Sequence, residues 1–409
     1  MKCRHCGGAL CLPFLDLGSA PPSNAYLSTA ALCAPETCYP LRILVCENCW
    51  LVQTEDHAGR EALFTQDYAY FSSFSTTWLA HAERYVTQMI KRFGLNASSC
   101  VVEVAANDGY LLQYIKQAGI PCYGIEPTTS TASAARSKGI DIVERFFGLE
   151  LADELAQTGR QADLMVANNV LAHVPDINDF VSGFSRLLKP QGVVTFEFPH
   201  LLRMVQENQF DTAYHEHYSY LSLTTVQHIL AANGLRLFAV EELPTHGGSL
   251  RVFAQRSDTG TLSHQQAVTD LLETEVKAGI KTAAFYRNFQ QQAERVKDDL
   301  LLFLIEAKRQ GLSVGAYGAA AKGNTLLNFA GIRPDLLPYV VDKNPAKQGK
   351  YLPGSRIAIV DEAHLKAHQP DRILILPWNL RQEVMGQLAY VRAWGGQFVT
   401  AVPKLTTFA

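Results

Sequence analysis

Residues 101–112 read VVEVAANDGYLL. The stretch begins as a buried strand, passes through a turn of small residues and continues as a helix, which is how the first strand of a doubly wound sheet meets a nucleotide-like ligand. Only Gly109 is a glycine, so the turn departs from the G-x-G-x-x-G pattern of dinucleotide-binding proteins. A pyrophosphate would fit poorly against such a turn. S-adenosylmethionine has no phosphate, so the turn favours that ligand.

The next expected strand ends at Glu126, about twenty residues further along the chain, where an acidic side chain accepts hydrogen bonds from ribose hydroxyls. A later strand, 163–167, is followed by two asparagines. Each of these features alone is weak evidence for a donor site, because a glutamate at the end of a strand is often only a surface residue. In this order and spacing they predict a class I methyltransferase. The expected donor-binding residues are Glu103, Ala105, Asn107, Gly109, Glu126, Asn168 and Asn169.

Strands and helices alternate on both sides of this stretch, which predicts an α/β protein with a parallel sheet covered on both faces. A polar helical connector is expected from about 260 to 310, and a second strand–glycine loop–helix unit opens at 312–318. We therefore expect three domains: a small N-terminal zinc module (1–75), a Rossmann-like methyltransferase domain (76–257), and a connector with a C-terminal Rossmann-like domain (258–409).

The bulk composition narrows the classes of function. The 409 residues carry a formal net charge of -3, with 47% hydrophobic and 18% charged residues, and the sequence pI is about 6.5. A chain without a basic field is a poor nucleic-acid or membrane-surface binder. No apolar run is long enough to span a bilayer, and the N-terminus lacks the apolar segment of a signal peptide. We expect a cytoplasmic protein with no nucleic-acid or membrane partner. The sequence does not determine its oligomeric state.

Two C-x-x-C pairs are present among nine cysteines, Cys3/Cys6 and Cys46/Cys49. Each pair places two sulfurs on one tight turn, and two such turns supply the four corners of a tetrahedral zinc site. Four thiolates leave no open coordination position, so the expected zinc is structural. The alternatives are reduced thiols without metal, or a redox pair, which would need a thioredoxin-like neighbourhood.

Further chemistry is expected from three other segments. His173 follows the strand that ends at 167, and it is either a helix-start residue or part of the reacting centre. Tyr214-x-Glu216-His217 offers a base and hydrogen-bond donors, or else a structural cluster at a helix start. Gly315-x-x-Gly318-x-x-x-Lys322 opens a helix whose amides and lysine suit a phosphate. The alternative is that the glycines of this loop only allow the strand and the helix to pack closely.

Taken together, the chain resembles the zinc-containing sugar C-methyltransferases of branched deoxysugar biosynthesis, which include the enzymes for tetronitrose, mycarose and noviose. The resemblance covers essentially the whole chain. It depends on the four cysteines and on the following motifs: YAYFSS at 68–73, EVAANDG at 103–109, NNVLAHVP at 168–175, YHEH at 214–217, HGGSLR at 246–251 and YGAAAKGN at 317–324.

This resemblance implies methylation at carbon 3 of a nucleotide-linked 4-keto-deoxysugar, usually a thymidine diphosphate sugar, with S-adenosylmethionine and Zn²⁺ as cofactors. A proton must leave C-3 before that carbon can accept a methyl group, so a base is needed beside the 4-keto group. By similarity, His217 is that base. The residues expected to line the same pocket are Tyr214, Glu216, Tyr70 and His173, and those expected to bind the substrate are His246, Gly248, Arg251, Tyr317, Gly318, Lys322 and Asn324.

Other functions remain open at this point. One is a nucleotide-sugar methyltransferase that acts at another position or on oxygen. A second is a nicotinamide-dependent sugar dehydrogenase that uses the C-terminal glycine loop, although the loop lacks the third glycine. A third is a zinc-finger regulator that binds nucleic acid, which the acidic pI opposes.

Overall fold

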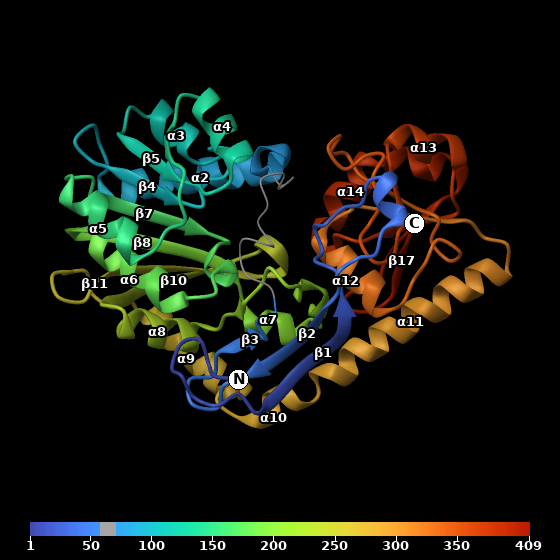
Figure 1. Ribbon diagram of the computed structural model, residues 1–409, viewed down its shortest axis with the longest axis horizontal. Coiled ribbons are helices and arrows are strands. Elements are labelled where there is room, and N and C mark those ends of the chain that lie inside the picture. Colours follow the sequence, from blue (N-terminus) through green and yellow to red (C-terminus); the bar gives the residue numbers. More distant parts are fainter. Residues whose placement is uncertain (58–70) are drawn as a thin grey trace.

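A computed structural model describes residues 1–57 and 71–409 of the chain. Two lobes stand side by side in it (Figure 1). The middle of the sequence forms one lobe and the C-terminal part forms the other. The N-terminal strands and the long helix α11 (Phe289–Arg309) run beneath both.

The middle lobe is built on a seven-stranded sheet with the order β10-β11-β8-β7-β4-β5-β6. Strands β4 to β8 run parallel, and β11 is antiparallel to its neighbours β8 and β10. The chain leaves β4 toward β5 and β6 and then returns to β7 on the other side of β4, so the switch point of the sheet lies between β4 and β7. The bounds are β4 Val101–Val104, β5 Cys122–Ile125, β6 Asp141–Val143, β7 Ala162–Asn168, β8 Leu188–Pro199, β10 Leu235–Leu243 and β11 Ser249–Arg256.

Helices cover both faces of this sheet, which confirms the expected doubly wound architecture. One face carries α2 Thr76–Phe93, α3 Leu112–Gln117 and α4 Thr129–Ser137. The other carries α5 Leu149–Gln157, α6 Ile177–Leu187, α8 Leu223–Ala232 and α9 Gln266–Ala278. The strands between them are buried on both sides, as their unbroken apolar runs predict.

The N-terminal residues form a small four-stranded sheet, β1-β2-β3-β9. Its bounds are β1 Leu12–Ala20, β2 Tyr39–Val45, β3 Val52–Thr54 and β9 Ser219–Tyr220. The last strand comes from the middle of the chain, where Tyr220 pairs with Val52 and Ser219 with Gln53. The turn between β2 and β3 holds Cys46 and Cys49, which places that C-x-x-C pair on a hairpin.

The C-terminal lobe contains a six-stranded sheet with the order β14-β13-β12-β15-β16-β17, parallel except for the last strand. Its bounds are β12 Val314–Tyr317, β13 Tyr339–Val341, β14 Ala358–Val360, β15 Arg372–Ile375, β16 Gln397–Thr400 and β17 Thr406–Phe408. Its helices include α12 Ala321–Phe329, α13 Glu362–His368 and α14 Arg381–Gln387. The chain adds β13 and β14 on one side of β12 and then β15 on the other side, so the switch point of this sheet lies between β12 and β15.

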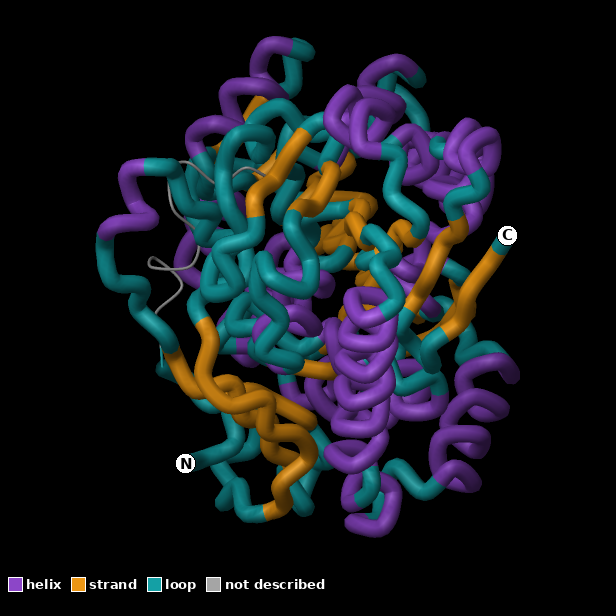
Figure 2. The backbone as a smooth tube through the Cα atoms, turned by 90° about the vertical axis from the view of Figure 1, so that its right-hand side faces the viewer, coloured by secondary structure: helices purple, strands orange, loops and turns teal. Residues whose placement is uncertain are grey.

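The N-terminal sheet and the C-terminal lobe share one hydrophobic core through α11. Helix α10 (Ala283–Arg287) and α11 pack on β1, and Figure 2 shows the strands of this sheet beside the helices. The buried seam of α11 recurs every three or four residues: Phe289, Ala293, Val296, Leu300, Leu304 and Ala307. Leu302, on the same helix, is 56% exposed because it lies off this seam.

In the described part of the chain, every helix is too short or too polar to cross a lipid bilayer.

Candidate active site

A cavity of about 770 Å³ lies where the two lobes and the N-terminal segment meet. Its walls come from the carboxyl edge of the seven-stranded sheet, from the loops after β12 and β15, from α2 and from Asn24. Both sheets therefore present their switch points to this region, which is where open α/β sheets bind ligands.

The turn after β4 forms one end of the cavity. Ala105, Asn107 and Gly109 all have positive φ, at 58°, 49° and 74°. Ala105 and Asn107 line the cavity, whereas Gly109 does not. A Cβ on Gly109 would lie 2.4 Å from Ile140 Cδ1, so this glycine permits close packing against β6 and its loop rather than contact with a ligand.

Glu126 lines the same end and is held firmly. Its Oε2 accepts the Asn107 N–H at 2.9 Å, and its Oε1 accepts the Thr128 N–H at 2.9 Å. Burial raises the pKa of this carboxyl above its usual value. Each carboxylate oxygen can accept a further hydrogen bond, so the pair of oxygens suits the two hydroxyls of a ribose.

Asn168 and Asn169 line the cavity beside this turn. The Oδ1 atoms of both side chains are buried and have no hydrogen-bond partner among the described residues. Buried polar atoms are normally satisfied, so these two acceptors indicate a polar ligand. Two orphaned acceptors and a ribose-compatible carboxylate fit S-adenosylmethionine.

Glu103 is not part of the cavity wall. It is 1% exposed and sits behind Tyr110, which does line the cavity. Burial raises the pKa of Glu103 well above its usual value, and the nearby Tyr110 hydroxyl only partly offsets this without completing a well-aligned hydrogen bond. Any role of Glu103 toward the donor is indirect in this arrangement.

The segment between the 3-10 helix Phe210–Thr212 and β9 carries Tyr214, Glu216 and His217 into the cavity. It is a turn closed by the His217 N–H to the Tyr214 carbonyl at 2.9 Å, and not the start of a helix. His217 Nδ1 lies 2.8 Å from the Thr212 carbonyl, which can only accept, so Nδ1 carries the proton. The Tyr214 hydroxyl donates to His217 Nε2 at 2.7 Å.

Burial favours the neutral form of His217, and in that form Nδ1 carries the proton and Nε2 accepts from Tyr214. Burial lowers the pKa of the imidazole well below the usual value, and the neighbouring His173 and Lys322 act in the same direction. The His173 ring centroid is 4.5 Å from that of His217. His173 Nδ1 donates to the Glu216 carbonyl at 2.9 Å, and burial lowers the pKa of His173 to about 4.

Glu216 is 1% exposed, and Asn24 Nδ2 approaches its two carboxylate oxygens at 2.9 and 2.7 Å. Asn24 was not among the residues predicted from the sequence, and it lies 192 residues from Glu216 along the chain. Tyr70, the remaining expected member of this group, lies outside the described residues.

Three of the expected substrate-binding residues line the cavity: His246, Arg251 and Lys322. His246 lies in a strained turn with φ 55°, and burial lowers its pKa to about 4. The Arg251 guanidinium is 2% exposed and donates to buried Glu197 at 2.8 Å, so its charge is already matched inside the protein.

The other four expected substrate-binding residues are not on the cavity wall. Gly248 packs against Arg203, Gly318 packs against Pro377, and the Tyr317 hydroxyl donates to Gln387 Oε1 at 3.3 Å. Asn324 is 1% exposed, and both polar atoms of its amide are without a hydrogen-bond partner in residues 1–57 and 71–409.

The C-terminal glycine loop does not offer a cradle for a dinucleotide. Asp342, at the end of β13, accepts the Ala319 N–H at 2.8 Å, and Lys347 donates to the Ala319 carbonyl at 2.8 Å. A Cβ on Gly318 would lie 2.4 Å from Pro377 Cδ, so the proline fills the space beside the glycine. The groups that would hold a pyrophosphate and a ribose are occupied, which argues against a nicotinamide-dependent dehydrogenase.

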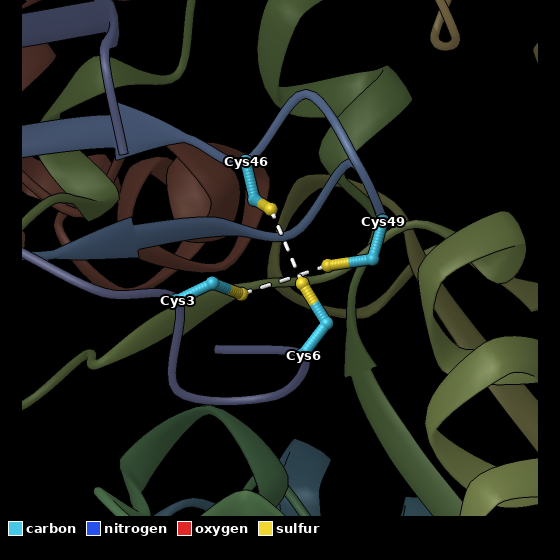
Figure 3. A group of neighbouring side chains, drawn as sticks. All are labelled: Cys3, Cys6, Cys46 and Cys49. Atoms are coloured by element: carbon cyan, nitrogen blue, oxygen red, sulfur yellow. Dashed lines mark hydrogen bonds between the residues drawn. The ribbon is translucent and has the colours of Figure 1, made fainter. Parts of the chain in front are cut away.

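The four cysteines of the two C-x-x-C pairs converge on one point (Figure 3). Their Sγ atoms all lie within 4.8 Å of one another, with Cys3 and Cys49 3.6 Å apart and Cys6 and Cys46 3.5 Å apart. Tetrahedral zinc with Zn–S bonds of about 2.3 Å requires sulfurs about 3.8 Å apart, so the cluster fits this metal. Gln53 Nε2 donates to Cys3 Sγ at 3.2 Å, as outer-sphere donors do toward thiolate ligands.

Comparison with known proteins agrees with this arrangement. Three family models match in succession: "Putative zinc binding domain" at residues 3–64, "Methyltransferase domain" at 78–240 and "C-methyltransferase C-terminal domain" at 244–403. The C-methyltransferase NovU of Streptomyces niveus is 33% identical over 405 residues, which are 98% of this chain and 96% of that protein. The chain belongs to this family of C-methyltransferases.

Solved structures similar to about half of this chain include two other methyltransferases. The magnesium protoporphyrin IX methyltransferase of Synechocystis PCC 6803 is 17% identical, with a TM-score of 0.36 over 50% of this chain and 100% of that chain. The 1,6-didemethyltoxoflavin-N1-methyltransferase of Burkholderia thailandensis is 14% identical, with a TM-score of 0.37 over 51% of this chain and 96% of that chain.

The C-methyltransferase thus depends on S-adenosylmethionine and carries a four-cysteine zinc-binding domain, as the sequence predicted. The four cysteines would fill the coordination shell of a tetrahedral zinc ion and lie outside the cavity wall, so zinc held there would stabilise the fold and leave no position for substrate.

Several cavity residues of the C-methyltransferase were missed by sequence reasoning. Trp78 and His81 come from α2, and Asn379 and Leu380 come from the loop after β15. The loop after β15 could have been found, because it follows a strand at the switch point of the second sheet. Nothing in the local sequence of α2 distinguishes its cavity face.

Proposed function

We propose that this C-methyltransferase methylates carbon 3 of a nucleotide-linked 4-keto-deoxysugar, with thymidine diphosphate as the nucleotide usual in the family that the sequence resembles. The observation that carries the proposal is the Tyr214–His217 pair. It is a buried hydroxyl–imidazole pair on the same cavity as Glu126 and as Asn168 and Asn169, whose Oδ1 atoms have no partner within residues 1–57 and 71–409.

A carbon acceptor needs a base more than an oxygen acceptor does, because a C–H bond beside a carbonyl must be broken to create the nucleophile. A neutral imidazole whose pKa is lowered by burial is unprotonated at neutral pH and available for that step. Its Nδ1–H bond to the Thr212 carbonyl keeps the basic lone pair on Nε2.

In the described geometry the Nε2 lone pair is covered by the Tyr214 hydroxyl. We therefore propose that the two side chains act together. Tyr214 takes the C-3 proton as its own hydroxyl proton passes to His217. The electron pair of the C–H bond becomes the C-3–C-4 double bond, and the carbonyl pair moves to the C-4 oxygen.

The enolate carbon is then methylated, the C-4 carbonyl re-forms, and the proton on His217 is released to solvent. S-adenosylmethionine, when bound, would supply the methyl group, whose bond to the sulfonium sulfur breaks as the bond to C-3 forms and leaves a neutral thioether. Glu126 and the turn after β4 would hold its ribose, and Asn168 and Asn169 would receive its remaining polar groups. Glu216, with Asn24 and His173, would keep the catalytic turn in position.

The test is incubation of the purified protein with S-adenosylmethionine and a set of nucleotide-linked 4-keto sugars, followed by mass spectrometry. The expected product has gained one methyl group that resists mild acid. A substrate deuterated at C-3 should lose that label on C-methylation and keep it on O-methylation or on methylation elsewhere in the sugar. Retention of the label in a methylated product would overturn the assignment to C-3.

A further inference from the structure

Lys322 reaches the cavity from the first turn of α12 in the C-terminal lobe. Among the described residues its hydrogen-bond partners are neutral and distant: the His246 carbonyl and Asn379 Oδ1, each 3.4 Å from Nζ. The Trp378 ring lies beneath the ammonium, with its centroid 4.9 Å from Nζ. An ammonium has three N–H donors, so donor capacity remains for a ligand.

Asp211 stands behind this lysine and belongs to the other lobe. It is fully buried at 0% exposure, and its Oδ2 accepts the Trp378 Nε1–H at 2.7 Å. Its Oδ1 has no hydrogen-bond partner in the described part of the chain. A buried carboxylate that is only half satisfied is costly, and the nearby ammonium is the charge that offsets the cost.

Asp211 and Lys322 each favour the charged form of the other. Burial raises the pKa of Asp211 to about 6, and Lys322 opposes that rise. Burial lowers the pKa of Lys322, and Asp211 opposes that fall. The carboxylate therefore favours the charged form of a lysine that its surroundings would otherwise neutralise.

The position of Lys322 relates it to the reacting atoms. Lys322 Nζ lies 3.4 Å from the His246 carbonyl, and the Trp378 ring beneath it is hydrogen-bonded to Asp211. In agreement with this position, the charge of Lys322 lowers the pKa of His217 and of His246. Asp211 directly precedes Thr212, whose carbonyl orients His217. One buried segment of the middle lobe thus carries both the partner of the lysine and the anchor of the base.

A cation in this cavity could contact either the C-4 oxygen or the diphosphate of the sugar substrate. The ring geometry of the sugar distinguishes these two roles. C-4 is bonded to C-3, whereas the diphosphate is attached at C-1 on the far side of the ring. A cation beside the base at C-3 is consequently beside the C-4 oxygen, where negative charge develops. A diphosphate ligand would be expected farther from His217.

We propose that the Lys322 ammonium, backed by the Asp211 carboxylate, donates a hydrogen bond to the C-4 oxygen of the sugar as the enolate forms. The inference rests on the proposed function and deepens it. Lys322 is then a catalytic residue contributed by the C-terminal lobe, and Asp211 is a positioning residue. No proton leaves the ammonium: it stabilises the oxyanion while C-3 is deprotonated and releases it when the carbonyl re-forms.

The experiment compares Lys322→Met with the wild type and with Lys343→Met, an exposed lysine of the same lobe that does not line the cavity. Three quantities are measured: affinity for thymidine diphosphate by calorimetry, the rate of methyl transfer, and the rate of C-3 hydrogen exchange in deuterated water. We expect Lys322→Met to bind the nucleotide within about threefold of wild type while both rates fall by about 10²–10³-fold. Lys343→Met should match wild type in all three.

Nucleotide affinity that falls tenfold or more in Lys322→Met, with catalysis restored at saturating substrate, would make Lys322 a phosphate ligand and overturn the inference. Unchanged catalysis in Lys322→Met would also overturn it while leaving the proposed function intact. A wild-type protein that methylates no 4-keto nucleotide sugar would instead defeat the proposed function, and the inference would fall with it.

A second variant tests the positioning role of Asp211. The charged groups that face Lys322 are Asp211 and, when protonated, His217 and His246. Asp211→Asn removes the anion, so the ammonium should lose its proton at lower pH. The alkaline limb of the kcat profile should move to lower pH in this variant, and Lys322→Arg in the same background should move it back. A profile of unchanged shape would contradict the pairing.

Discussion

Replacement of Tyr214 by Phe separates two accounts of the catalytic pair. The hydroxyl that it removes donates to His217 Nε2 at 2.7 Å. In a proton relay, loss of the hydroxyl breaks the path from C-3 to the imidazole. In a simple capping arrangement, loss of the hydroxyl only uncovers the lone pair.

The two accounts predict different changes in turnover for Tyr214→Phe. Nδ1–H is committed to the Thr212 carbonyl at 2.8 Å, so Nε2 is the one basic atom of the ring. A relay that is lost should cost the typical contribution of a positioned base, about 10²–10⁴-fold in turnover. An uncapped buried acceptor costs about 1–3 kcal/mol of stability, yet it makes Nε2 a stronger base and should not slow the reaction.

The assay is C-3 hydrogen exchange in deuterated water together with methyl transfer, measured for Tyr214→Phe and His217→Asn. Asparagine can still donate to the Thr212 carbonyl, so the turn should persist while the base is lost. The matched control is His215→Asn. His215 lies in the same turn, contacts the Tyr39 carbonyl at 3.1 Å and is not on the cavity wall. We expect both active-site variants to lose exchange and turnover with donor affinity intact, and the control to keep them.

Near-normal turnover in Tyr214→Phe with an inactive His217→Asn would refute the relay and make the imidazole the direct base. Activity in both variants would remove the base from this turn altogether. The pH profile gives an independent check: burial lowers the pKa of His217, and a base works when it is unprotonated. The acid limb of kcat/KM should therefore lie below the ordinary imidazole value of about 6.5.

Three further perturbations test the rest of the site. Cys6→Ser should lower the zinc content from about one per chain and reduce the melting temperature more than the turnover, whereas Cys11→Ser, at an exposed cysteine outside the cluster, should change neither. Glu126→Ala should weaken S-adenosylmethionine binding by about 1–3 kcal/mol in calorimetry, and unchanged affinity would place the ribose elsewhere. Asn24→Asp sets a second carboxylate against Glu216 and should lower kcat more than Asn24→Ala does; equal activity in both would show that this contact does not support the catalytic turn.

Features that depend on near neighbours in the chain could be predicted. The two C-x-x-C pairs implied the cysteine cluster, because each tight turn brings its own two sulfurs together. The apolar strand, the small-residue turn and the helix after it implied the fold around Ala105 and Asn107. The i, i+3 spacing of Tyr214 and His217 implied proximity, which a backbone turn then provides.

Other features depend on segments far apart in the sequence. The contact of Asn24 with Glu216 spans 192 residues, and that of Trp378 with Asp211 spans 167. The apolar and polar patterns of each segment specify which face is buried, but they do not specify which distant segment covers it.

The sequence by itself predicted the cluster of four cysteines, the class of fold and the small-residue turn after the first strand of the large sheet, since local spacing and turn chemistry are sufficient for these. The tertiary structure decided that Glu103 lies behind the cavity wall, that Gly109 and Gly318 serve packing, and that Lys322 lines the same cavity as Tyr214 and His217 of the other lobe. The physical reason is that a side chain's access to a cavity is set by everything packed around it, and most of those neighbours are distant in the chain.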